Sequence, residues 1–147
     1  MSINVMKYHF KKIRIAILTG VILSVISFKL SYFAHFITSE IDKDYSNTCL
    51  LRSWSDPKML WFFIHPFVTS VIMAFTWSFA KGNFKDKFNT ESGARFGLLF
   101  WIISLPSLLL SYSIFPISLL LTITWAITGL SQAIVAGYIF SKTIQRG

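Results

Sequence analysis

Two ionisable side chains lie inside otherwise apolar stretches of this chain, and they are the first candidates for a functional site. Lys29 lies about seven residues before the end of one apolar stretch, and His65 lies about six residues after the start of the next. At 1.5 Å per helical residue, they would lie about 10 Å and about 9 Å from the same membrane boundary. Ionisable residues at such depth commonly face a partner or a wet cavity, so both are candidates for ligand binding.

Hydroxyl side chains at the corresponding ends of two later apolar stretches could complete a polar pocket with this pair. All six acidic residues fall outside the apolar stretches, which argues against a proton relay built on a buried acid. A pocket without an acid suits an anionic or carbonyl-bearing ligand, such as a lipid headgroup. The predicted ligand-binding residues are Lys29, His65, Ser107, Ser111, Thr122 and Thr124.

Each of the two ionisable residues also has a purely structural interpretation, which stays open at this point. Lys29 could extend its aliphatic stem through lipid and place its ammonium among the headgroups. His65 could be neutral and bonded to a backbone carbonyl that Pro66, which has no amide hydrogen, leaves unpaired.

The sequence carries no motif for a named reaction. It contains no glycine-rich phosphate loop, no His-Glu-x-x-His zinc motif and no Gly-x-Ser-x-Gly nucleophile elbow. Cys49 is the single cysteine, so neither an intrachain disulfide nor a cysteine metal site can form. We therefore predict no catalytic residues, no metal and no cofactor, and we favour a protein that is not an enzyme.

Four apolar stretches must position these residues. With 54% hydrophobic and 14% charged residues, the chain is too apolar for a soluble domain, and each stretch reaches the length of about 20 residues that a spanning helix needs. We predict one all-α transmembrane domain over residues 1–147, folded as a four-helix bundle. The expected spans cover residues 13–36, 59–80, 96–114 and 117–140.

Local signals refine two of these boundaries. Asp56 can cap a helix whose first residue is Pro57, which needs no amide hydrogen there. The apolar run from Phe96 to Phe140 would be about 67 Å long as one helix, against a hydrocarbon core of about 30 Å. It must fold back. Residues 111–116, which end in Pro116, predict a tight hairpin between the third and fourth spans.

The distribution of basic residues predicts the orientation. Ten of the 14 Lys and Arg residues fall at the N-terminus, in the second loop or at the C-terminus, and three fall in the first loop. The positive-inside rule then places both termini in the cytoplasm of a multi-pass protein of the cell membrane. The same dispersal beside membrane boundaries argues against nucleic-acid binding.

Small residues at four-residue spacing predict where helices approach closely, because helices in lipid associate through close packing. Such contacts could lie within one chain or between two copies of it. Expected partners are membrane lipids and either a second copy or another membrane protein. The predicted packing residues are Ala16, Gly20, Ser24, Gly93, Gly97, Gly129, Ala133 and Gly137.

About a third of the chain carries a family resemblance. It rests on Gly93-Ala94-Arg95-Phe96-Gly97-Leu98-Leu99, Leu105-Pro106, Tyr112, Phe115-Pro116-Ile117, Trp125, Gly129-Leu130 and Ala136-Gly137. This segment, residues 93–137, resembles the C-terminal hairpin of small four-span prokaryotic integral membrane proteins of unknown function. The resemblance implies the four-span layout and no particular activity.

Two classes of function follow. The favoured one is a small non-enzymatic membrane protein that packs with other proteins or contacts lipid. The alternative is a subunit of a carrier or channel-like assembly that uses an outward-facing polar cluster for an anionic or carbonyl-bearing ligand.

Overall fold

A computed structural model describes residues 3–47, 51–53, 55–80 and 90–144, and in these ranges the regular structure is helical. The elements are α1 (Ile3–Ile37), α2 (Ser39–Ser46), the short 3-10 helix η1 (Pro57–Met59), α3 (Leu60–Ala80), α4 (Thr90–Ile114) and α5 (Leu119–Thr143). Four of the helices are long and apolar enough to cross a membrane. The predicted helical class with four apolar helices is therefore confirmed for this part of the chain. Cys49 and the basic residues Lys81, Lys85, Lys87 and Arg146 lie outside the described residues.

Two helices extend well beyond the predicted apolar spans. The first long helix, α1, begins at Ile3, about three turns before residue 13, and the third long helix, α4, begins at Thr90, ahead of residue 96. Polar residues can continue a helix outside lipid, because only the apolar part needs to match the membrane. Near the start of α4 the guanidinium of Arg95 donates to Glu91 in the first turn, a pairing that supports a helix end in water.

Side-chain caps set the starts of α3 and α5. Asp56 accepts the backbone N–H of Lys58 at 2.8 Å, and Pro57 opens η1, as the sequence predicted. Ser118 accepts the backbone N–H of Leu121 at 3.1 Å and caps α5, which begins at Leu119. The chain changes direction between α4 and α5 over residues 115–118.

The short helix α2 was not predicted, because residues 39–46 contain several charged residues and little apolar pattern. It lies over the connection between α4 and α5, where its buried Ile41 packs with Ile117 and Leu121. Asp44 of α2 accepts the backbone N–H of Ser118 at 2.9 Å. The helix α2 is thereby fixed to the start of α5.

The small residues lie where helices of this chain touch. A Cβ on Gly93 would come within 2.5 Å of the backbone oxygen of Gly137, and one on Gly97 would meet the backbone of Ala133. These four residues bring the backbones of α4 and α5 into contact.

The other small residues lie along α1 and α5. Gly20 faces Phe67 of α3, and the Ala16 carbonyl accepts the Ser70 hydroxyl at 2.7 Å. The Ser24 hydroxyl donates to the Gly20 carbonyl within α1, and Gly129 faces Trp101 across the α4–α5 interface. The small-residue stripes thus contribute to packing within one chain.

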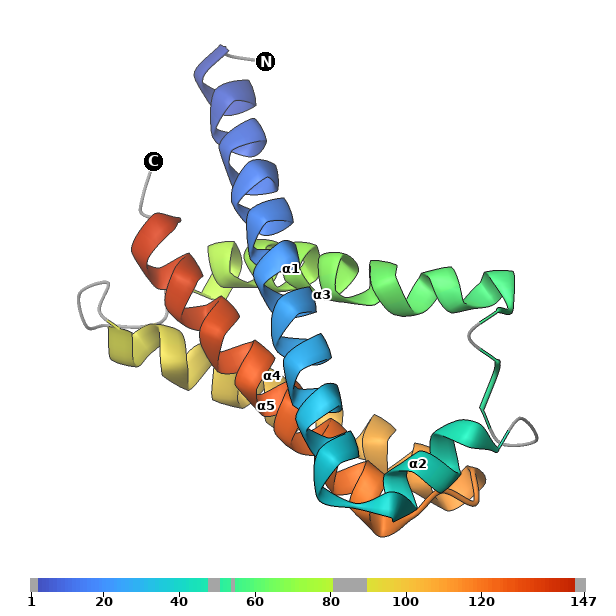
Figure 1. Ribbon diagram of the computed structural model, residues 1–147. Coiled ribbons are helices and arrows are strands. Elements are labelled where there is room, and N and C mark those ends of the chain that lie inside the picture. Colours follow the sequence, from blue (N-terminus) through green and yellow to red (C-terminus); the bar gives the residue numbers. More distant parts are fainter. Residues whose placement is uncertain (1–2, 48–50, 54, 81–89, 145–147) are drawn as a thin grey trace.

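The apolar core occupies one end of the molecule. Leu23, Met73, Trp77, Phe96 and Phe140 are buried there, and the rings of Trp77 and Phe96 meet edge to face with centroids 5.2 Å apart. From this core α3 crosses α1, and its N-terminal half extends away from α4 and α5 (Figure 1). The helix that α3 contacts most is α1. All four long helices meet at this core, and at the other end α3 alone diverges while α1, α4 and α5 stay together (Figure 1).

We expect Gly137→Ala to destabilise the protein by about 1–3 kcal/mol, the usual cost of adding a methyl group where no space exists. The new Cβ would meet backbone atoms of Gly93 and Gly97 at 3.1 Å or less, and backbone cannot turn aside. Gly129→Ala is the matched control, because its Cβ would find Trp101 at an ordinary 3.6 Å. Thermal unfolding in detergent, followed by circular dichroism, measures both; equal midpoints for the two variants would contradict the close contact.

Candidate functional site

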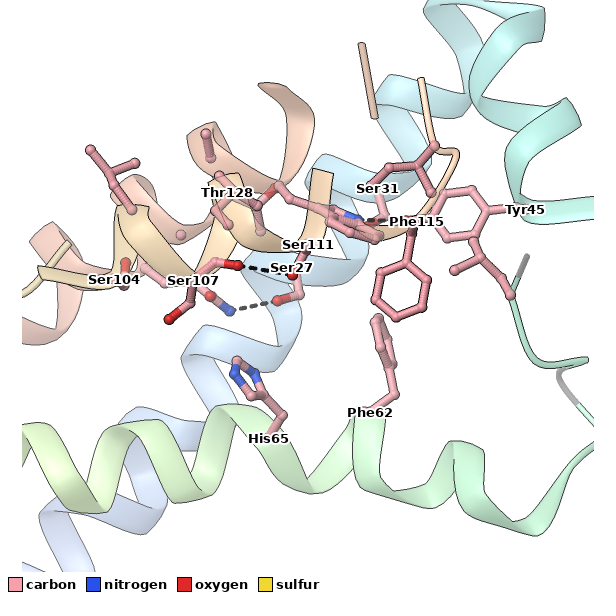
Figure 2. Close-up of a pocket in the computed structure, with 18 of the residues that line it drawn as sticks. Ser27, Ser31, Tyr45, Phe62, His65, Ser104, Ser107, Ser111, Phe115 and Thr128 are labelled. Carbon is pink, nitrogen blue, oxygen red and sulfur yellow. Dashed lines mark hydrogen bonds between the residues drawn. The ribbon is translucent and has the colours of Figure 1, made fainter. Parts of the chain in front are cut away.

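A pocket of about 970 Å³ lies where α3 diverges from α4 and α5. Its walls come from all four long helices, from Tyr45 of α2 and from the segment before α3. Figure 2 shows α3 on one side of the space and α1, α4 and α5 on the other. A pocket of this size is near the top of the range of about 300–1,000 Å³ found for small-molecule sites.

Hydroxyl groups form one wall of the pocket, and helical spacing explains why. Ser104, Ser107 and Ser111 follow one another at three and four residues, so they share one face of α4, and Ser27 and Ser31 share a face of α1. Ser104 donates to the Trp101 carbonyl at 2.6 Å, and Ser111 donates to the Ser107 carbonyl at 2.9 Å. Bonds to the helix's own carbonyls make such hydroxyls compatible with an apolar setting.

The base of the pocket holds Gln132 of α5 and His65 of α3. Gln132 is buried, and its Nε2 donates to the Leu23 carbonyl at 3.1 Å and to the Ser27 hydroxyl at 2.5 Å. His65 points from α3 across the space toward Ser27 of α1 (Figure 2). Its Nε2 lies 3.4 Å from the Thr69 hydroxyl, which is too long for a strong hydrogen bond. The base therefore combines an amide, an imidazole and a hydroxyl.

Aromatic residues and one ion pair form the rim. The indole N–H of Trp125 donates to the Tyr45 hydroxyl at 3.2 Å, which ties α5 to α2. Phe62 of α3 and Phe115 of the α4–α5 connection point toward one another (Figure 2). Arg52 donates to the second carboxylate oxygen of Asp56 at 2.9 Å.

Three of the six predicted ligand-binding residues line this pocket, namely His65, Ser107 and Ser111. Lys29 does not, because it follows Ser27 by two residues, and about 200° of helical rotation turns it to the opposite, exposed face of α1. Thr122 and Thr124 do not line it either. Their hydroxyls donate to the carbonyls of Ser118 and Leu120 one turn earlier on α5.

Sequence reasoning missed several lining residues. Gln132 carried a usable signal, because it is the one amide side chain within the four apolar stretches, and polar residues in spans commonly bond to another helix. Ser27 and Ser31 also carried a signal in their four-residue spacing. The remaining polar lining residues that were missed are Tyr45, Arg52, Ser104 and Thr128.

No group of three or more His, Cys, Asp or Glu side chains is placed to hold a metal ion among the residues that the structure describes. The pocket instead offers hydroxyl, amide and imidazole groups beside leucine and aromatic side chains. Such a lining can bind an amphipathic molecule through hydrogen bonds at one end and apolar contact at the other.

We expect Gln132→Leu to lower stability by about 1 kcal/mol, within the range measured for hydrogen bonds between membrane helices. The substitution removes both bonds from α5 to α1 and leaves the Leu23 carbonyl without this donor. Ser131→Ala is the control, because the Ser131 hydroxyl bonds only within α5, to the Ile127 carbonyl at 2.9 Å. Unfolding in mixed detergent micelles compares the two, and equal stability would remove Gln132 as a link between the helices.

Comparison of the chain with protein-family models, with curated proteins and with solved structures gave no match. The resemblance of residues 93–137 to small four-span membrane proteins therefore stays a prediction.

Proposed function

We propose that this chain is a non-enzymatic, multi-pass protein of the cell membrane that holds part of a lipid molecule in the pocket between α3 and α4. The observation that carries the proposal is the position of the pocket. It lies between helices that are apolar enough to span a membrane, at the end where α3 diverges from its neighbours. Hydrocarbon chains of the surrounding bilayer would fill the space beside these helices, so a lipid can enter without passing through water.

The chemistry of the lining supports a lipid ligand. Leu105, Leu108 and Phe62 offer apolar contact for a hydrocarbon chain. The hydroxyls of α1 and α4 offer polar contact for the part of the lipid that joins chain and headgroup. Both kinds of contact lie in one space, as an amphipathic ligand requires.

The proposed orientation places both termini in the cytoplasm and the pocket in the outer half of the membrane. The beginning of α1 and the end of α5 lie toward the same side of the molecule, away from α2 and the α4–α5 connection (Figure 1). Of the basic residues predicted to be cytoplasmic, Lys11, Lys12 and Arg14 lie in the beginning of α1 and Lys142 lies in the end of α5. A tight hairpin at Pro116 would then face the outside.

Holding a lipid fits better than carrying a solute across the membrane. The end opposite the pocket is filled by the buried core, where the rings of Trp77 and Phe96 touch. A pathway through one copy of the chain would have to separate these rings and the surrounding side chains. We therefore keep the carrier or channel-like subunit as the less favoured function.

We expect Ser111→Phe to reduce the lipid that the purified protein retains by several-fold, because the ring would occupy pocket volume on the α4 wall. Ser113→Phe is the matched control. Ser111 and Ser113 both donate to the carbonyl four residues earlier at 2.9 Å, but Ser113 is not among the residues that line the pocket. Native mass spectrometry from mild detergent measures the retained lipid.

Two results would contradict the proposal. One is a folded wild-type protein that retains no lipid in mild detergent. The other is equal retention by the wild type and by the Ser111→Phe variant while both are folded.

A further inference from the structure

The charges around the pocket nearly cancel. Arg52 is the one formally charged side chain among the described lining residues, and it is paired with Asp56. The backbone N–H of Lys58 and the Arg52 guanidinium lower the pKa of the Asp56 carboxyl, so this carboxyl is charged at neutral pH and balances Arg52. Lys29 faces the opposite side of α1. An anionic group bound deep in this space would have no unpaired cation beside it, which is costly away from water.

The base of the pocket does offer hydrogen-bond donors. Because the Ser27 hydroxyl accepts from Gln132, its own proton can be donated to a ligand. An imidazole carries a proton on at least one of its ring nitrogens, and His65 points into the same region (Figure 2). Ser104 and Ser111, by contrast, donate to backbone carbonyls of α4. The donors at the base therefore match an uncharged acceptor.

Building on the proposed function, we infer that the pocket recognises an uncharged lipid through a carbonyl oxygen, with His65 and Ser27 as the donors. The carbonyl can belong to the ester of a glyceride or to a quinone, and the two share this chemistry. Apolar lining side chains, such as Leu105 and Phe115, would contact the hydrocarbon part.

A comparison of lipids with and without a carbonyl, and with and without a negative charge, tests this inference on the unmodified protein. The protein is reconstituted in nanodiscs of ether-linked phosphatidylcholine, which has no carbonyl on its chains. Dioleoylglycerol, its diether analogue, ether-linked phosphatidylglycerol and decylubiquinone are then added separately, and bound lipid is measured by native mass spectrometry.

We expect dioleoylglycerol or decylubiquinone to bind about tenfold more tightly than the diether, the effect of one hydrogen bond in a site with little water. Whichever of the two binds more tightly identifies the source of the carbonyl. Ether-linked phosphatidylglycerol should bind no better than the uncharged diether. Equal binding of all the uncharged lipids, or preference for the anionic lipid, would overturn the inference.

Substitutions at His65 test the donor directly. His65→Leu should abolish the preference for a carbonyl, whereas His65→Gln should keep most of it, because the amide retains an N–H group. Thr69→Val is the control for a structural role, since Thr69 lies near His65 but is not a lining residue. If the preference survives His65→Leu, or if Thr69→Val removes it equally, His65 is not the donor.

The Asp56→Asn substitution tests whether the Arg52–Asp56 ion pair disfavours anionic lipids, because it should increase the binding of an anionic lipid. Asparagine caps helices as well as aspartate does, so α3 should start unchanged, while the charge of Arg52 is no longer balanced. Binding of ether-linked phosphatidylglycerol should increase several-fold, and adding Arg52→Gln should reverse the increase. Unchanged binding would show that the ion pair does not select against anions.

These experiments separate the inference from the proposed function. Retention of lipid without any preference for a carbonyl overturns the inference alone. A folded protein that retains no lipid of any kind overturns both.

Discussion

The close backbone contact between α4 and α5 is the constraint on which the rest of the structure depends. In lipid, apolar side chains gain little by leaving their surroundings for another helix, so helices associate through van der Waals packing and hydrogen bonds. Gly93, Gly97 and Gly137 allow this packing by removing the side chains that would hold the two backbones apart. The resulting pair gives α1 a surface to pack on, and α3 in turn packs mainly on α1. The pocket exists because α3 packs mainly on α1 and meets α4 near its own C-terminal end, where Trp77 contacts Phe96.

Polar bonds between helices complete this arrangement. Ser70 of α3 donates to the Ala16 carbonyl of α1 at 2.7 Å, and Gln132 of α5 donates to the Leu23 carbonyl of the same helix. Trp101 of α4 donates to the Ala126 carbonyl of α5 at 2.9 Å. In each case a side chain reaches a backbone carbonyl of a different helix, so each bond fixes both the rotation and the height of a helix. These bonds between helices explain why His65 of α3 and Ser27 of α1 both lie at the base of the pocket.

The sequence predicted those parts of the fold that depend on local composition. Four apolar helices follow from the lengths of the stretches, and the start at Pro57 follows from the chemistry of Asp56. The pocket could be predicted only in part, because its lining depends on how each helix is rotated and how far α3 diverges. Lys29 and Ser27 lie two residues apart and face opposite ways, which depth alone cannot distinguish. The helix α2 was missed because tertiary contacts of Ile41, and not an apolar pattern, hold it in place.

The bonds that join the ends of the chain also constrain the order of assembly during synthesis. Gln132 meets Leu23 across 109 positions of sequence, and Asp44 meets Ser118 across 74. When a ribosome has completed α1, α2 and α3, Gln132 and Ser118 have not yet been made. At that stage α1 and α3 can pack on each other, since Ser70 bonds to the Ala16 carbonyl, but both long-range contacts form only when α5 arrives. The synthesis of α5 thus brings together the base and the rim of the pocket.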